Sequence, residues 1–373
     1  MKISKEKLEN LKKLANEDGV IAALAIDQRG SMEKMMKKAN ESLNNVEGIS
    51  EFKRQVSKEL TPFSSSILLD PIYGKTAIDA KDENAGLIIS YEQTGYDEYE
   101  VGRLPRLIDF MSGLRAKEMG ANALKVLLYY DVDEDEKIND VKKAWVERVG
   151  YEAEGLGLPY FLEIVTYDYT LDSEKDEKYA KVRPKKVIEA MKEFDNPKYK
   201  VDVLKVETPV NMNFVEGYGE NFVYSKDQAK KFFKDQADAT SIPFIFLSGG
   251  VSAELFKETL VFAKKAGSNF NGVLCGRATW KDCVDIYAKD TEKSKQWLKE
   301  QGKENIQSLN EVLKETAVSI FEKIEKQKNL KSKLRQLLIN QLNWSWIKYQ
   351  RRYNNIYMMV TTNEGGCNAF RWK

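Results

Sequence analysis

Eight short apolar runs recur along the chain, and the gaps between them leave room for helices. The runs occupy residues 21–27, 65–70, 86–92, 123–131, 160–168, 203–209, 244–250 and 272–278. They are apolar along nearly their whole length, which is typical of parallel strands buried on both faces. Eight such strands joined by helical crossovers predict a (β/α)8 TIM barrel of the α/β class.

A doubly wound open sheet is the competing architecture. The first run is not followed by the glycine-rich phosphate loops GxGxxG or GxxxxGK[ST] that open many sheets of that kind. Polar residues follow nearly all eight runs, whereas an open sheet gathers its functional groups at one switch point. The barrel is therefore the favoured prediction.

Helical periodicity appears between and before the strands. Residues 184–194 place their apolar side chains on one face, and Pro184 suits the first helical position. Ser252 suits the N-cap of a helix that ends before Gly267. Residues 4–15 form a short amphipathic segment, which we expect to close the bottom of the barrel.

Composition limits the chemistry that the chain can perform. The 373 residues include no histidine, which excludes Ser-His-Asp and Cys-His catalysis and zinc sites that need histidine ligands. The three cysteines include no CxxC pair, no stretch is long and apolar enough to span a membrane, and the net charge is +1. These features predict a cytoplasmic protein without a metal and without a nucleic acid or membrane partner.

The chain divides by composition near residue 327. Residues 1–327 carry the predicted barrel, and residues 328–373 are predicted to be an extension of helical and irregular structure, partly disordered. This extension has nine Lys or Arg residues against one acid, Glu364, and holds half of the six tryptophans. Such a composition also occurs in segments that bind nucleic acid or acidic membranes. A docking helix or a poorly ordered extension is the favoured interpretation.

Three ionisable residues interrupt neighbouring strands. Lys125, Glu163 and Lys205 each lie inside an apolar run, and a side-chain period of two allows all three to face the barrel interior. A lysine becomes a nucleophile when its pKa falls, and burial and a second ammonium both act in that direction. The set predicts amine catalysis on Lys205, with Glu163 transferring protons. The alternative is a buried ion cluster that only stabilises the barrel.

Glycines at the ends of the last two strands predict an anion site. Backbone N–H groups around Ser248, Gly249 and Gly276 can approach a phosphate closely, and Arg277 adds a cation suited to bidentate contact. The same glycines are also compatible with plain turns. Across the barrel mouth, Gln28 and Arg29 could hold a second anionic group, and a surface ion pair is the alternative for Arg29.

Eight motifs then give a resemblance to a known family. They read AIDQRG, SSSILLDPIYG, ANALKVLLYYD, PYFLEIVTYD, AKVRPKKV, DVLKVETPVN, LSGGVSAELF and FNGVLCGRATW, in this order between residues 25 and 280. Together they resemble the Schiff-base class of tagatose 1,6-bisphosphate aldolases, and the likeness runs from about residue 10 to residue 325. One motif departs mildly, with LSGG in place of LSAG, and the extension after residue 327 has no counterpart.

The resemblance implies a role for each candidate residue. Lys205 would form the Schiff base and Glu163 would transfer protons. Lys125, Asp27 and Gln28 would contact substrate hydroxyls or tune the lysine. The remaining candidates would bind phosphate: Ser248, Gly249, Gly276 and Arg277 one group, and Arg29, less securely, the other.

The implied activity is cleavage of D-tagatose 1,6-bisphosphate in the breakdown of lactose and galactose. It needs no cofactor or metal, and the implied partner is a small sugar bisphosphate, in a chain that could form homo-oligomers. The alternatives are an aldolase for another phosphorylated sugar, such as fructose 1,6-bisphosphate or a deoxyribose phosphate, and a sugar-phosphate-sensing regulator on the same scaffold. We expect residues 167–184 and 211–222 to form loops at the mouth, either as lids or as solvated segments.

Overall fold

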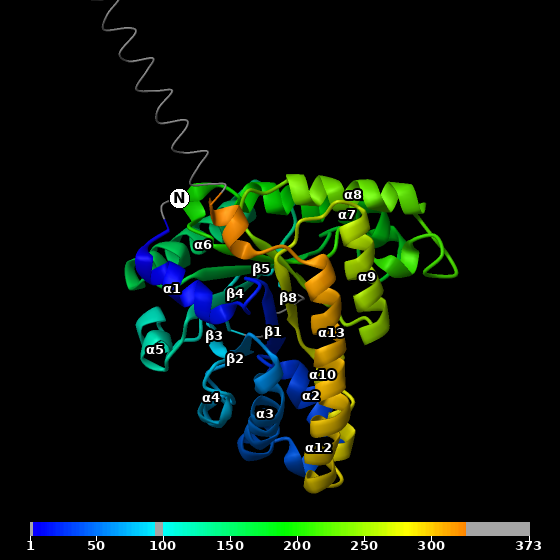
Figure 1. The fold of residues 1–373 in the computed structure, drawn as a ribbon. Helices are drawn as coiled ribbons and strands as arrows, with labels where there is room; N and C mark the ends of the chain where they lie inside the picture. Colours follow the sequence, from blue (N-terminus) through cyan, green and yellow to red (C-terminus); the bar gives the residue numbers. More distant parts are fainter. Residues whose placement is uncertain (1–2, 94–99, 326–373) are drawn as a thin grey trace, which may run out of the picture. The chain divides into compact units, whose positions relative to one another are not determined.

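The computed structural model describes residues 3–93 and 100–325, and these form a closed barrel of eight parallel strands in sequential order (Figure 1). The strands are β1 (Ile21–Ala25), β2 (Ser66–Leu69), β3 (Gly86–Ser90), β4 (Ala123–Tyr130), β5 (Tyr160–Thr166), β6 (Val203–Val206), β7 (Phe244–Leu247) and β8 (Gly272–Cys275). All eight predicted strands are confirmed, and each begins within a residue of its predicted start. They end earlier than predicted, because the polar residues that follow them belong to the loops of the mouth.

One helix precedes the first strand, and the others follow the strands and pack around the barrel. They are α1 (Lys5–Leu14), α2 (Gly30–Ala39), α3 (Val46–Leu60), α4 (Lys75–Ala80), α5 (Gly113–Glu118), α6 (Glu136–Leu156), α7 (Glu177–Phe194), α8 (Lys226–Asp238), α9 (Ala253–Lys265), α10 (Arg277–Trp280), α11 (Cys283–Tyr287), α12 (Thr291–Trp297) and α13 (Lys303–Thr316). Among the described residues no helix is long and apolar enough to span a membrane. The predicted extension, residues 328–373, lies outside the described residues.

Two helix starts test the capping predictions. Ser252 caps α9 as predicted, since its hydroxyl accepts a hydrogen bond from the backbone N–H of Leu255 at 3.2 Å. The prediction for Pro184 is wrong, because α7 begins at Glu177, where Asp176 caps it. Pro184 therefore lies inside the helix, where it lacks the N–H that would bond to an earlier carbonyl.

The barrel interior is apolar at its lower end. Leu11 and Leu14 of α1 pack against inward side chains at the starts of the strands, including Ile21, Phe161 and Val203. The predicted closure of the barrel bottom by the N-terminal helix is therefore confirmed. Lys125, Glu163 and Lys205 lie further along their strands, toward the end where the strands finish, and this end carries the functional sites of such barrels.

Gly272 shows how tightly the barrel is closed, and it gives a stability prediction. Its φ is +134°, and a Cβ atom there would lie 2.0 Å from the carbonyl oxygen of Ile21, its partner across β1 and β8. We expect Gly272→Ala to lower the free energy of unfolding by about 3 kcal/mol or more, measured by denaturant titration. Gly155→Ala is the control, because the added methyl meets no atom within 4 Å, and it should stabilise α6 by up to about 1 kcal/mol. Equal stability of the two variants would contradict the prediction.

Candidate active site

Three charged side chains from adjacent strands meet inside the barrel mouth. Glu163 of β5 and Lys205 of β6 are paired in register on adjacent strands, and Lys125 of β4 faces inward beside them. The Lys205 Nζ lies 2.7 Å from Glu163 Oε1, and the Lys125 Nζ lies 2.6 Å from Glu163 Oε2. One carboxylate thus bridges two amines, and all three side chains are at least nine-tenths buried. The structure brings together the three residues that the sequence selected.

The two lysines differ in their surroundings. Lys125 contacts three carboxylates: Glu163, Glu92 at 2.8 Å and Asp27 at 3.1 Å. Burial would lower the pKa of Lys125, but these carboxylates outweigh it and raise that pKa well above its ordinary value. Within the described residues, Lys205 makes a single ion pair, with Glu163. Lys125 is therefore a fixed cation, and Lys205 is the more available amine.

Glu163 and Asp27 stay ionised because the neighbouring lysines lower their pKa values. Burial would raise the pKa of Glu163, yet the nearby ammonium groups of Lys125 and Lys205 lower it below its ordinary value. The pKa of Asp27 is lowered in the same way, against the effect of burial, by the same two lysines. A carboxylate that is ionised at neutral pH beside an amine can accept a proton from it.

Glu92 belongs to this cluster although the sequence gave it no role. It follows β3 and pairs with Lys125, and one of its oxygens also lies 3.7 Å from the guanidinium of Arg29. Arg29 Nη2 donates a hydrogen bond to the Glu92 carbonyl at 2.6 Å, and the arginine is 4% exposed. The surface ion pair suggested for Arg29 is therefore wrong, because the side chain turns inward. The signal for Glu92 was its place at a strand end, directly after Tyr91.

A second missed group supports the loop after β1. Lys53 of α3 and Asp70 after β2 form a fully buried ion pair, and Lys53 Nζ also donates a hydrogen bond to the Gln28 carbonyl at 2.9 Å. Burial lowers the pKa of Lys53, although the Asp70 carboxylate acts in the opposite direction. This pair holds the backbone that carries Asp27 and Gln28.

The loops after β7 and β8 lie together. A Cβ atom on Gly250 would be 3.3 Å from Arg277 Nη2, and one on Gly276 would be 3.2 Å from Gln28 Nε2. Gly249 and Gly250 have φ of +60° and +83°, a conformation in which glycine exposes its backbone N–H groups without strain. Arg277 is exposed, and Ser248 is half-buried. The structure thus places Arg277 beside the glycine loop, and Gln28 beside Gly276.

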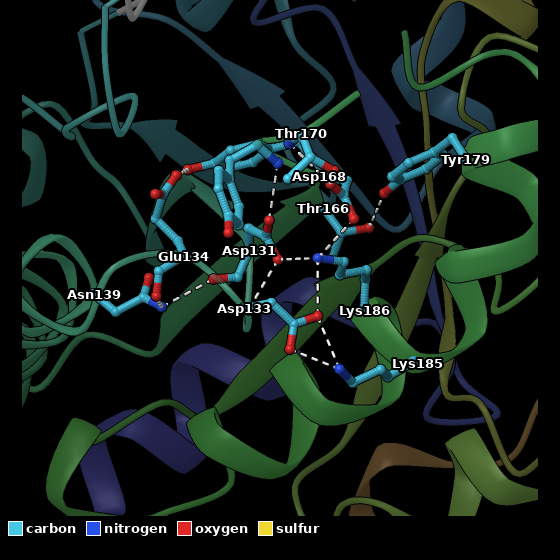
Figure 2. A network of polar contacts seen from close by, with 12 residues as sticks. Asp131, Asp133, Glu134, Asn139, Thr166, Asp168, Thr170, Tyr179, Lys185 and Lys186 are labelled. Carbon is cyan, nitrogen blue, oxygen red and sulfur yellow. Dashed lines mark hydrogen bonds and ion pairs between the residues drawn. The ribbon is translucent and has the colours of Figure 1, made fainter. Parts of the chain in front are cut away.

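A further charged cluster lies at the ends of β4 and β5 (Figure 2). Lys186 of α7 is buried and forms an ion pair with Asp131, and it lies 3.0 Å from both Asp133 and Asp168. Asp131 also accepts a hydrogen bond from the backbone N–H of Tyr169 at 2.9 Å. The cluster fixes the starts of two mouth loops. Sequence reasoning missed it because Lys186 comes from a helix.

Comparisons with known proteins agree with this architecture. Residues 21–282 match the family model described as "DeoC/LacD family aldolase". A protein of Enterococcus faecalis named tagatose 1,6-diphosphate aldolase 1 is 55% identical, over 87% of this chain and 99% of its own length. One of Staphylococcus haemolyticus named tagatose 1,6-diphosphate aldolase is 52% identical, over 85% of this chain and 98% of its own.

Solved structures show the same fold at low identity. Fructose-bisphosphate aldolase from Plasmodium falciparum, in complex with TRAP and an inhibitor, aligns with a TM-score of 0.59 at 16% identity, over 82% of this chain and 94% of that one. An archaeal fructose 1,6-bisphosphate aldolase aligns with a TM-score of 0.52 at 15% identity, over 82% and 98%. The family model and the relatives that are more than half identical decide the assignment: the chain belongs to the DeoC/LacD family of aldolases and groups with its tagatose 1,6-diphosphate aldolases.

Proposed function

We propose that this aldolase cleaves D-tagatose 1,6-bisphosphate to dihydroxyacetone phosphate and glyceraldehyde 3-phosphate through a Schiff base on Lys205. The observation that carries the proposal is the placement of Glu163, whose two oxygens lie within 2.7 Å of the amines of Lys205 and Lys125. The relatives that are more than half identical bear the name of this activity. The proposed setting is the cytoplasmic breakdown of lactose and galactose, and assembly into homo-oligomers stays a prediction.

The reaction begins with the amine of Lys205. It adds to the C2 carbonyl of the open-chain ketose, and loss of water gives an iminium ion. Addition requires the neutral amine, and the proton that the ammonium gives up leaves with the departing water. The iminium then accepts the electron pair of the C3–C4 bond as that bond breaks.

Glu163 serves the cleavage step. It takes the proton of the C4 hydroxyl as C4 becomes the aldehyde carbon of glyceraldehyde 3-phosphate. The enamine left on Lys205 is protonated at C3, and addition of water releases dihydroxyacetone phosphate and the free lysine. Lys125 keeps its charge throughout, because three carboxylates surround it. With Asp27 and Gln28 it is assigned to the substrate hydroxyls.

The phosphate on C1 is assigned to the loops after β7 and β8. Backbone N–H groups at Ser248, Gly249 and Gly276 supply neutral donors, and Arg277 supplies the charge. The adjacency of Arg277 and Gly250 supports this assignment. Arg29 remains the weaker candidate for the other phosphate, because its guanidinium already bonds to Glu92.

Borohydride trapping tests the proposal directly. The protein is incubated with dihydroxyacetone phosphate and sodium borohydride, digested, and its peptides are examined by mass spectrometry. We expect a reduced adduct on Lys205 and none on Lys125, whose ion pairs hold it charged. An adduct on another lysine, or no adduct, would contradict the mechanism.

Discrimination between sugar epimers is expected to be loose. Tagatose and fructose bisphosphates differ at C4, and the carboxylate proposed to act there has two oxygens, either of which can accept the proton of the C4 hydroxyl. We expect the ratio of their kcat/KM values to stay below about 10³, or ~4 kcal/mol. Steady-state kinetics with both sugars measures this ratio, and a larger preference would show that the pocket reads the C4 hydroxyl rigidly.

A further inference from the structure

Two tyrosines follow the charged cluster along β4 and β5, and one of them, Tyr167, is buried. Tyr129 follows Lys125 on β4 at even spacing and so shares its inward face, and Tyr167 stands in the same relation to Glu163 at the end of β5. Tyr129 is half-buried, whereas its neighbour Tyr130 is buried under the helices. The inner face of these two strands therefore continues beyond the catalytic cluster as an aromatic surface.

Arg103 lies on this aromatic surface. Its guanidinium carbon is 4.3 Å from the ring centre of Tyr167 and 5.4 Å from that of Tyr129. Its side chain is 17% exposed and forms an ion pair of 2.8 Å with Glu174, from the loop between β5 and α7. Stacking on aromatic faces leaves the edge of a guanidinium free to donate hydrogen bonds in its plane. Arg103 thus presents a fixed cation at the mouth.

The backbone at Arg103 is held in an unfavourable conformation. Its φ is +43°, and it follows Gly102 at +82°. A left-handed conformation costs a non-glycine residue about 1 to 2 kcal/mol, and such residues gather at functional sites. The backbone of Gly102 also abuts α6, because a Cβ atom there would lie 2.7 Å from the Ile138 side chain. The chain therefore accepts strain to bring Arg103 to this position.

The ring beneath the guanidinium is itself anchored. The Tyr167 hydroxyl accepts a hydrogen bond from Lys142 Nζ at 2.8 Å and donates one to Glu134 Oε2 at 3.0 Å. Lys142 is buried, and its ammonium also lies 4.8 Å from the Tyr167 ring centre. Arg103 therefore rests on a ring fixed from below, in a region that already holds a second cation.

We propose that Arg103 binds the second phosphate of the sugar bisphosphate, on the half that leaves as the aldehyde. This inference rests on the proposed function, which assigns the first phosphate to the loops after β7 and β8. Arg103 lies over Tyr129 of β4, and in the closed order of strands β4 lies opposite β8, which Arg277 follows. Lys205 is on β6, which comes between β4 and β8 in that order. A ketose with a phosphate at each end and its carbonyl at C2, between the two phosphates, matches that order of groups.

Glu174 is then the partner of Arg103 in the absence of substrate. Its side chain is 37% exposed, so it can turn toward water when a phosphate takes its place. A phosphate dianion offers the guanidinium two charge-assisted hydrogen bonds, which outcompete a single exposed carboxylate. Because Glu174 belongs to one of the predicted mouth loops, binding would also free that loop from this contact.

The test compares two substrates that differ only in the second phosphate. We expect Arg103→Met to lower kcat/KM for tagatose 1,6-bisphosphate by about 10²-fold. The same variant should change kcat/KM for tagatose 1-phosphate by less than about threefold, since this sugar lacks the group in question. Arg106→Met is the matched control: Arg106 is on the same loop, exposed, and 3.5 Å from Glu100. It should behave as the wild type with both sugars.

The outcomes separate this inference from its alternatives. Equal losses on both sugars would show that Arg103 only supports the loop, and an unchanged preference for the bisphosphate would place the second phosphate elsewhere; either result overturns the inference. Glu174→Gln should leave kcat/KM for the bisphosphate unchanged or higher, and a fall like that of Arg103→Met would also overturn the inference. Trapping of dihydroxyacetone phosphate on Lys205 should survive Arg103→Met. A wild type that gives no adduct would instead refute the proposed mechanism, whatever Arg103 does.

Discussion

Lys205→Met is expected to abolish sugar cleavage, with a fall in kcat of at least about 10⁴-fold. Methionine has nearly the length of lysine but no amine, so no iminium forms and the C3–C4 bond has no electron sink. The variant should fold, because Glu163 keeps its 2.6 Å contact with Lys125 when Lys205 is lost. Steady-state kinetics coupled to detection of dihydroxyacetone phosphate measures the effect, and thermal unfolding checks the fold.

Lys205→Arg is the variant that distinguishes catalysis from a structural role. Arginine restores the positive charge beside Glu163 but is not a nucleophile at neutral pH. If Lys205 only balances charge in a buried ion cluster, the arginine variant should retain most of the activity. If Lys205 is the Schiff-base residue, both variants should be equally inactive and neither should give a borohydride adduct.

The sequence selected these residues because they interrupt otherwise apolar strands. Lys205 stands between Leu204 and Val206, and Glu163 between Leu162 and Ile164, so a period of two was enough to place both in the interior. The barrel followed from the same regularity, repeated eight times. These predictions need only local pattern and the geometry of parallel strands.

Partners that reach the site from helices and loops leave no comparable signal. Lys53 lies on a helix and becomes informative only when folding brings it to Asp70. Glu92 follows a strand, and its contact with Lys125 likewise depends on the folded chain. Arg29 shows the converse, because its place after a strand was compatible with a surface ion pair, whereas the fold buries its side chain beside Glu92. Pairing between distant residues depends on tertiary packing, which neither spacing nor composition encodes.

Glu163→Gln is expected to lower kcat by about 10² to 10⁴-fold while leaving Lys205 able to form an adduct. Glutamine keeps the shape of the side chain but cannot accept the proton of the C4 hydroxyl. The expected signature is therefore a split between two measurements: slow cleavage of the bisphosphate, and a trapped adduct of dihydroxyacetone phosphate on Lys205. Loss of the adduct as well would mean that Glu163 is needed already to form the Schiff base. Full cleavage activity would remove Glu163 from the mechanism.

Glu163→Gln should also change how the free energy of unfolding depends on pH. Because the ammonium groups of Lys125 and Lys205 hold the pKa of Glu163 below its ordinary 4.5, against the effect of burial, the ionised carboxylate stabilises the fold at pH values above 4.5. That contribution is lost as the pH falls through the lower pKa of the folded state. The wild type should therefore exceed Glu163→Gln in free energy of unfolding at neutral pH, and the gap should narrow in acid. Denaturant titrations from pH 7 downward measure the gap, and a gap independent of pH would show that the carboxylate is not held ionised by its two lysines.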